Sequence, residues 1–120
     1  SGIMTYYKAK IPVVLCTDDE GILRTNLTHQ YEIAVQWYNF SYPELKNIVR
    51  NSIYYSFLPG KNLWKSSSYK LVNKLCKFDF YKKQLITKKC KKFLSKNEKA
   101  HMEWNLEMRF IKFEKSIKNT

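Results

Sequence analysis

The chain has 120 residues, with 22 Lys and Arg against 10 Asp and Glu, which gives a formal net charge of +12. A chain of this length buries roughly two-thirds of the surface that its unfolded form exposes, so it is at most one domain and can hold a core without metal or disulfide. The 44% apolar content, with only three Gly and three Pro, excludes collagen-like, linker-like and wholly disordered classes. The longest apolar run, Ile11 to Cys16, is far shorter than the roughly 20 residues that cross a bilayer, so we expect no membrane span.

The first predicted element is a strand over about residues 11–16. The run Ile-Pro-Val-Val-Leu-Cys is apolar at successive positions and rich in β-branched residues, which is typical of a strand buried on both faces of a parallel sheet. Such a strand needs neighbouring strands, and the rest of the sequence offers no convincing candidate. We therefore expect the partner strands to lie outside these 120 residues.

Four or five helices are predicted after the strand. Apolar residues at helical spacing predict helices over about 28–38, 41–56, 69–94 and 96–117. The third of these regions suits either one or two helices, with Lys on the solvent side. Capping boxes open the second and the last, at Ser41-Tyr-Pro-Glu44 and Ser95-Lys-Asn-Glu98.

The three cysteines, Cys16, Cys76 and Cys90, lie far apart and form no Cys-x-x-Cys pair. This spacing indicates neither a disulfide framework nor a zinc ribbon. We expect free and mostly buried thiols.

The positive charge is concentrated between Lys61 and Lys99, where 13 Lys face only Asp79 and Glu98. Five aromatic residues are interleaved with these lysines: Trp64, Tyr69, Phe78, Phe80 and Tyr81. This composition keeps a Lys-rich polyanion- or nucleic-acid-binding helical module as an alternative function. Most of these aromatics fall on the helical apolar stripe, which places them in the core, and Lys suits a solvated face better than bidentate recognition. Nucleic acid is therefore disfavoured as the main partner.

Two adjacent carboxylates, Asp18 and Asp19, follow the predicted strand directly. Carboxylates crowded at the end of a buried strand repel each other and resist desolvation, so they usually need a cation or a bound ligand. In a barrel of parallel strands, this end is also where active sites lie. The plain alternative is that one of them caps the following turn in contact with water.

The order and spacing of four segments resemble the last barrel strand and following helices of the adenosine deaminase family. These segments are residues 11–21, 27–34, 45–53 and 56–60. Residues 98–114 look like the terminal helix of the bacterial, growth-factor-type members. The resemblance implies that residues 1–120 are the C-terminal part of an α/β TIM (β/α)8 barrel. It also implies a Zn²⁺-dependent hydrolase that converts adenosine and water to inosine and ammonia.

Carried over by resemblance, Asp18 is the catalytic residue and carboxylate zinc ligand that also orients the attacking hydroxide. Asp19 binds the substrate through N7 of the purine. The family's other metal ligands are histidines, but His29 and His101 lie in no matching motif and are expected to face solvent. The resemblance therefore implies that the missing N-terminal barrel portion is a required partner and that the chain is inactive alone.

Three further alternatives stay open from the sequence. A Tyr-x-x-Ala-x-Gln pattern at Tyr31, Ala34 and Gln36 is similar to AMP deaminases, which leaves the substrate open among adenosine, AMP and another amino-purine. The chain could also be a non-catalytic structural remnant of a deaminase. The compartment is open as well, with the cytoplasm slightly favoured over the periplasm or secretion.

Overall fold

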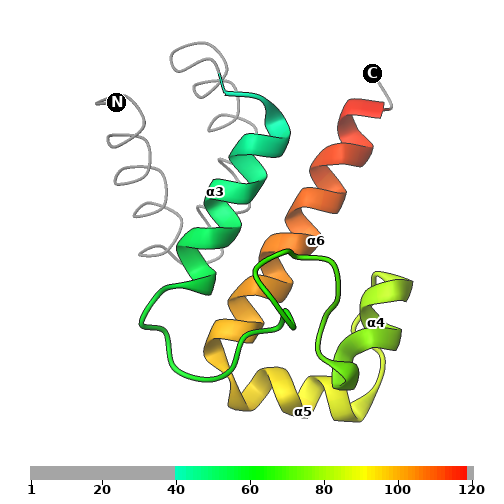
Figure 1. Ribbon diagram of the computed structural model, residues 1–120. Coiled ribbons are helices and arrows are strands. Elements are labelled where there is room, and N and C mark those ends of the chain that lie inside the picture. The colour runs from blue at the N-terminus through cyan, green and yellow to red at the C-terminus, as the bar shows by residue number, and fades with distance from the viewer. Residues whose placement is uncertain (1–39, 119–120) are drawn as a thin grey trace.

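The computed structural model describes residues 40–118 (Figure 1). In chain order these residues form α3 (Tyr42–Tyr54), the 3-10 turn η1 (Lys74–Cys76), α4 (Lys77–Lys82), α5 (Lys88–Lys96) and α6 (Glu98–Lys118). The predicted strand at 11–16 and the predicted helix at 28–38 lie outside the described residues. Between residues 40 and 118 the only β pairing is an isolated antiparallel bridge between Trp64 and Val72. None of the described helices combines the length and apolar content needed to cross a bilayer.

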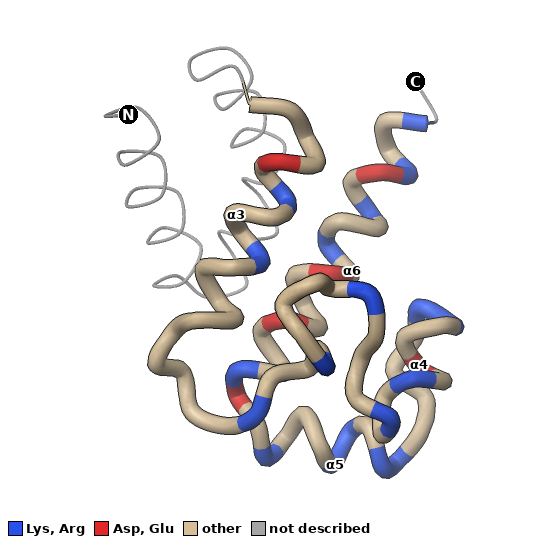
Figure 2. The backbone as a smooth tube through the Cα atoms, in the orientation of Figure 1, with Lys and Arg blue, Asp and Glu red and all other residues tan. Residues whose placement is uncertain are grey.

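Charge is distributed unevenly over these helices (Figure 2). Lys and Arg recur along α4 and α5, whereas Asp and Glu lie mostly on α3 and α6. Every Lys from Lys70 to Lys96 is exposed. The local excess of positive charge is therefore a property of one end of the molecule, where the short helices gather.

Helix α3 begins with the capping box that the sequence predicts. The Ser41 hydroxyl accepts a hydrogen bond from the Glu44 N–H at 3.3 Å, and Glu44 Oε1 accepts one from the Ser41 N–H at 3.0 Å. These two bonds satisfy amides that a helix start otherwise leaves open. The helix lies within the predicted range 41–56 and ends two residues earlier.

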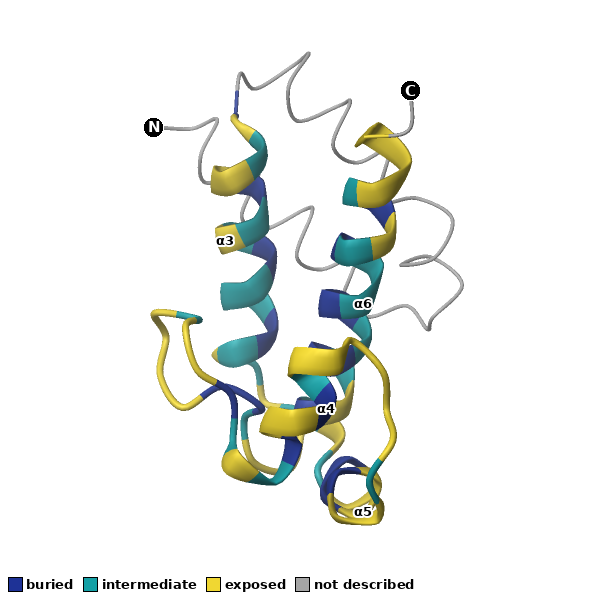
Figure 3. Ribbon diagram, turned by 90° about the vertical axis from the view of Figure 1, so that its right-hand side faces the viewer, coloured by how far each residue is buried: buried dark blue, intermediate teal, exposed yellow. Residues whose placement is uncertain are grey.

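Helices α3 and α6 lie side by side and share one apolar core (Figures 1 and 3). Leu45, Val49 and Ile53 of α3 are fully buried, because their spacing of four residues places them on one face. They pack against Leu106, Phe110 and Phe113 of α6, with Phe40 completing the cluster. The first half of α6 packs into a second cluster through Ala100 and Trp104. Helix α6 thus joins both cores.

The start of α6 differs from the prediction. Ser95 is not its cap, because Ser95 belongs to α5 and its hydroxyl donates to the Lys92 carbonyl at 2.8 Å. The residue before α6 is Asn97, whose Oδ1 accepts from the Lys61 N–H at 2.7 Å. The predicted capping residue is wrong because α5 continues through Ser95 to Lys96.

The region 69–94 is more broken than the predicted one or two helices. The Asn73 side chain caps η1 by accepting from the Leu75 N–H at 2.9 Å, and Lys83 ends α4 in the left-handed conformation, at φ 59°. Thr87 then caps α5 by accepting from the Cys90 N–H at 3.3 Å. These local side-chain bonds and the left-handed residue interrupt the helical periodicity that the apolar pattern suggests.

The expectation of free thiols is wrong for two of the three cysteines. Cys76 and Cys90 form a disulfide with a Cα–Cα distance of 4.7 Å. The break between α4 and α5 turns the chain back, so η1 and α5 pack together and bring the two residues close. Spacing alone could not reveal this, because a separation of 14 residues becomes a short distance only once that turn is known. Cys16 lies outside the described residues.

Gly60 lies where the loop after α3 meets the junction of α5 and α6. Its φ is +99°, a conformation that residues with a side chain rarely adopt. A Cβ at this position would lie 2.6 Å from the Asn97 Cα. The Pro59 carbonyl accepts from the Lys99 N–H at 2.9 Å, so the contact is held by backbone on both sides.

Candidate functional site

The predicted site residues Asp18 and Asp19 lie outside the described residues, and so does His29. His101 is exposed on α6, in agreement with its predicted position facing solvent. What the structure describes is therefore the helical part of the chain that follows the predicted site in sequence. Its polar side chains show which groups are free for chemistry and which are engaged in holding the helices.

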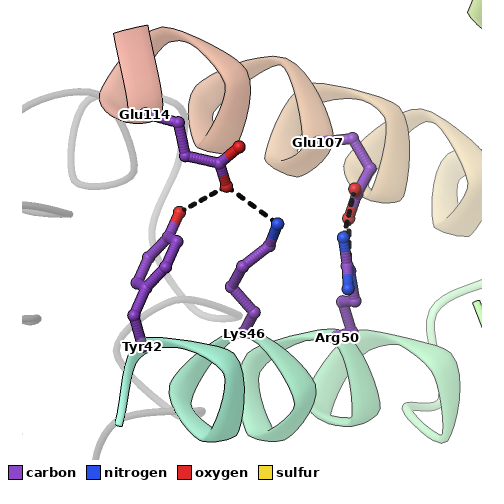
Figure 4. A network of polar contacts seen from close by, with 5 residues as sticks. All are labelled: Tyr42, Lys46, Arg50, Glu107 and Glu114. Atoms are coloured by element: carbon purple, nitrogen blue, oxygen red, sulfur yellow. Dashed lines mark hydrogen bonds and ion pairs between the residues drawn. The ribbon is translucent and has the colours of Figure 1, made fainter. Parts of the chain in front are cut away.

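Arg50 and Glu107 form the central ion pair between α3 and α6 (Figure 4). Arg50 Nε donates to Glu107 Oε2 at 2.8 Å and Nη2 donates to Oε1 at 2.7 Å, a bidentate pair. The guanidinium also lies 5.6 Å from the Trp64 ring centroid and 5.5 Å from that of Phe110. Burial lowers the pKa of Arg50, but the Glu107 carboxylate outweighs it and raises the pKa. Both Glu107 oxygens are engaged, so this buried carboxylate has a structural role.

A second polar group lies nearer the N-terminal end of α3. The Tyr42 hydroxyl and Lys46 Nζ both donate to Glu114 Oε2, at 2.9 and 2.8 Å (Figure 4). Burial, and then the bond to Glu114, raise the pKa of Tyr42 far above its usual value. Burial alone would raise the pKa of Glu114, but the bonds from Lys46 and Tyr42 lower it. This arrangement fixes a phenol and a carboxylate in their usual protonation states and cross-links the helices.

Asp79 is buried in the turn between α4 and α5, where it organises the polypeptide. Its Oδ2 accepts from the Ile86 and Thr87 N–H groups, each at 2.6 Å, and its Oδ1 accepts from the Thr87 hydroxyl at 2.7 Å. Desolvation raises the pKa of this carboxyl, but the bonds from Thr87 and Ile86 outweigh that effect and lower it. Both oxygens of this carboxylate are therefore engaged in holding the turn.

Glu103 is the one buried carboxyl of the described residues with an unpartnered oxygen. It is 2% exposed; its Oε1 accepts from the Leu63 N–H at 2.7 Å and its Oε2 has no hydrogen-bond partner. Desolvation raises its pKa to about 7, even though the bond from Leu63 and the charge of Lys99 lower it. Such a pKa suits proton transfer, but the group lies enclosed between the two cores.

The residues from 40 to 118 do not fit a zinc site. No group of three His, Cys, Asp or Glu among them lies close enough together to hold a metal ion. The chemistry agrees, because Cys76 and Cys90 are joined to each other and Asp79 already accepts three hydrogen bonds.

An open pocket lies over α4, and sequence reasoning missed it. Its volume is about 530 Å³, and its lining consists of Lys74, Lys77, Phe78, Tyr81, Lys82 and Lys89. The expectation that the interleaved aromatics are core is wrong for Phe78 and Tyr81, which are 50% and 84% exposed, whereas Trp64 is buried. Residues 74, 77, 78 and 81 share a helical spacing of three and four, so their sequence pattern is equally that of a basic aromatic face.

Comparisons with known proteins match part of the chain. A family model described as "Adenosine deaminase" matches residues 2–75, which is more than half of the chain. The human "N6-Methyl-AMP deaminase" is 33% identical over 52 residues, covering 43% of this chain and 15% of the human protein. The "N6-Methyl-AMP deaminase-L" of Xenopus laevis is 36% identical over 52 residues, with the same two shares. The "N6-mAMP deaminase" of Arabidopsis thaliana is 40% identical over 47 residues, covering 39% of this chain and 13% of that protein.

The chain thus spans only 13–15% of the length of these curated relatives. No solved structure matches it significantly. The family match includes the whole stretch from the predicted strand to the end of α3, and it ends at residue 75, where η1 lies. On this match, the chain belongs to the adenosine deaminase family.

Proposed function

We propose that residues 1–120 form the C-terminal part of a zinc-dependent hydrolase that removes the 6-amino group of a purine nucleoside or nucleotide. In this proposal Asp18 is the catalytic zinc ligand and Asp19 contacts N7 of the purine. The observation that carries it is the family match over residues 2–75, because that match includes both carboxylates in their context at the end of the predicted strand. Membership of the family implies a TIM barrel, which normally needs about 250 residues.

The division of work between the two carboxylates follows from elementary chemistry. Zinc, when bound, acts as a Lewis acid and lowers the pKa of a water molecule towards neutrality. A carboxylate such as Asp18 is an ordinary oxygen ligand for this metal. Asp19 can hydrogen-bond the N7 atom, an acceptor, only if the carboxyl group or the purine carries a proton, and crowding next to Asp18 favours protonation.

In this proposal the described helices have a structural role. The bidentate pair of Arg50 with Glu107 and the bonds to Glu114 fix α3 against α6, and none of these groups is free for catalysis. In this proposal the other metal ligands and the partner strands come from a portion of the barrel outside residues 1–120. The chain alone is expected to be inactive.

There are two candidate substrates in this proposal. Adenosine is the substrate implied by the resemblance to the bacterial, growth-factor-type branch. The second candidate is N6-methyl-AMP or AMP, because the relatives reported above are named for N6-methyl-AMP. Hydrolysis at the same ring carbon would release ammonia from adenosine or AMP and methylamine from N6-methyl-AMP, so the released amine and the purine product distinguish the candidates.

The test uses the full-length protein to which this chain belongs and three variants. Zinc content and turnover of adenosine, AMP and N6-methyl-AMP are measured for the wild type, Asp18→Ala, Asp19→Asn and Glu20→Gln. Asp18→Ala should lose both bound zinc and turnover, whereas Asp19→Asn should keep zinc and lose kcat/KM. Glu20→Gln is the matched control, since it removes a neighbouring carboxylate that has no proposed role, and it should change neither quantity.

Two results would contradict the proposal. Retention of zinc and activity by Asp18→Ala would show that this carboxylate is not the ligand. Efficient deamination by residues 1–120 alone would show that no further barrel portion is needed.

A further inference from the structure

The pocket over α4 combines cationic and aromatic groups in one hollow. Lys74 comes from η1, Lys77 and Lys82 from the two ends of α4, and Lys89 from the first turn of α5. Between them lie Phe78 and Tyr81, on successive turns of α4. Tyr81 is 84% exposed and Phe78 50% exposed, and Lys82 Nζ lies over the Phe78 ring, 5.9 Å from its centroid, so Tyr81 offers the freer ring to a ligand.

The surroundings of this pocket are strongly cationic. Residues 70–97 contain ten Lys and a single acidic residue, Asp79. Asp79 is buried and its oxygens accept bonds from Ile86 and Thr87, so it does not neutralise the surface. Among the residues that the structure describes, neither ion pair uses one of these ten lysines. Their charges are therefore available to an anionic partner.

A smaller hollow extends the same surface. Its volume is about 140 Å³, and it shares Lys77 and Tyr81 with the larger pocket while adding Lys70 and Leu71. The two hollows adjoin at Lys77 and Tyr81, and we refer to them together as the groove. Adjoining hollows lined by lysines and aromatic rings suit an extended chain that carries repeated negative charges and flat rings.

We propose that this groove binds single-stranded nucleic acid, with phosphates on the lysines and bases stacked on Phe78 and Tyr81. Sequence-independent binding of single strands combines a cationic groove with exposed aromatic rings. Lys offers a compact point charge that contacts phosphate without reading base edges, so little sequence preference is expected. Most of the groove lies beyond residue 75, where the family match ends, so the deaminase function does not account for it.

An anionic membrane surface is the other partner that such charge could serve. Binding to a membrane interface requires apolar side chains that project into the acyl boundary. Here the aromatic rings line the larger hollow. Leu71 is the one exposed aliphatic residue in the lining of either hollow, and the exposed Leu85 and Ile86 line neither. The geometry therefore favours single strands, and membrane binding becomes an outcome of the test.

The experiment measures binding of the 120-residue chain to a fluorescent oligonucleotide of about ten nucleotides, a length within the usual site size, over a series of salt concentrations. With phosphates on the four lysines of the larger hollow, the logarithm of the affinity should fall with the logarithm of the salt concentration with a slope of about −3. The double variant Lys77→Gln, Lys89→Gln should halve this slope. Its matched control, Lys112→Gln, Lys115→Gln, removes the same charge from the far part of α6 and should leave the slope unchanged.

Stacking is tested with a second pair of variants. Tyr81→Ala should weaken binding roughly tenfold. Phe57→Ala should have no effect, because Phe57 is a fully exposed aromatic outside the groove. Polyphosphate, which carries charge but no bases, should bind more weakly than the oligonucleotide and should not respond to Tyr81→Ala. Circular dichroism verifies that each variant keeps its helices.

Three outcomes would overturn the proposal. Equal weakening by the groove and control lysine variants would show a general charge effect. Unchanged oligonucleotide affinity in Tyr81→Ala would exclude stacking. Binding to phosphatidylserine vesicles that depends on Tyr81, with oligonucleotide binding that does not, would assign the surface to membranes. None of these outcomes bears on deaminase turnover, so the two proposals fail separately.

Discussion

Replacement of Glu103 by Gln should change the dependence of stability on pH. In the folded chain the pKa of this carboxyl is raised from 4.5 to about 7, chiefly because burial penalises its charge. The folded state therefore holds the proton more tightly than the unfolded state. The stability that this provides is fully present below about pH 4.5 and is lost as the pH rises through about 7.

The magnitude follows from the two pKa values. Between about pH 5 and about pH 8 the wild type should lose on the order of 2 kcal/mol through this group, since one pKa unit corresponds to about 1.4 kcal/mol. Gln keeps the shape and can still accept from the Leu63 N–H, but it does not ionise. The variant should thus match the wild type near pH 5 and exceed it by about 2 kcal/mol near pH 8.

Urea unfolding, followed by circular dichroism at several pH values, measures this difference. Comparison with the variant cancels the contributions of the other titrating groups. Parallel pH profiles of wild type and Glu103→Gln would refute the reasoning, because they would mean that Glu103 ionises freely in the folded state.

Three further predictions concern how the helices are held. Gly60→Ala should destabilise the chain by about 2 kcal/mol or more, because the added Cβ would collide with backbone at a residue of positive φ. Urea unfolding should show this as a lower midpoint. An unchanged midpoint would contradict the described loop. The double variant Cys76→Ser, Cys90→Ser should lose about 3 kcal/mol of unfolding free energy, as expected for a disulfide loop of this size. Thiol titration of the unreduced wild type should detect neither cysteine. Reactive thiols at both positions would refute the disulfide. Arg50→Met should lower the free energy of unfolding by about 3–5 kcal/mol, because it leaves the Glu107 carboxylate buried and unpaired. The double variant with Glu107→Leu should recover most of this stability. If it does not, Arg50 acts mainly through its stacking contacts.

The long helices were predictable because their signals are local. Ser41 and Glu44 stand three residues apart before an apolar stripe, and both capping-box bonds form at the start of α3, whereas the same spacing at Ser95 and Glu98 does not cap α6. The stripe along α6, with Phe110 among its fully buried residues, likewise follows from spacing. In both cases the residues that decide the structure are neighbours in sequence.

The middle of the chain depends on contacts between residues distant in sequence, so the sequence predicts it less well. The turn after α4 is organised by the Asp79 carboxylate, which reaches forward to Ile86 and Thr87. That turn decides which side of α4 faces out, and it leaves Tyr81 exposed where helical spacing placed it in the core. The disulfide between Cys76 and Cys90 depends on the same turn.

The predicted roles of Asp18 and Asp19 rest on the family and not on the described helices. The resemblance to the adenosine deaminase family implies the roles of Asp18 and Asp19, and the family match includes both residues. Their assigned roles remain predictions, because neither residue is among those that the structure describes. In the described part, the carboxylates of Glu107 and Glu114 hold α3 against α6.

The most direct test of the central claim is turnover of adenosine and N6-methyl-AMP by the full-length protein in water enriched in the heavy oxygen isotope. A hydrolytic deaminase must place one heavy oxygen atom on the purine ring carbon that loses the amine, and it must release one amine for each product molecule. We predict this labelling in the wild type and its loss in Asp18→Ala. Absence of purine turnover in the zinc-loaded wild type, or equal labelling by Asp18→Ala, would contradict the account.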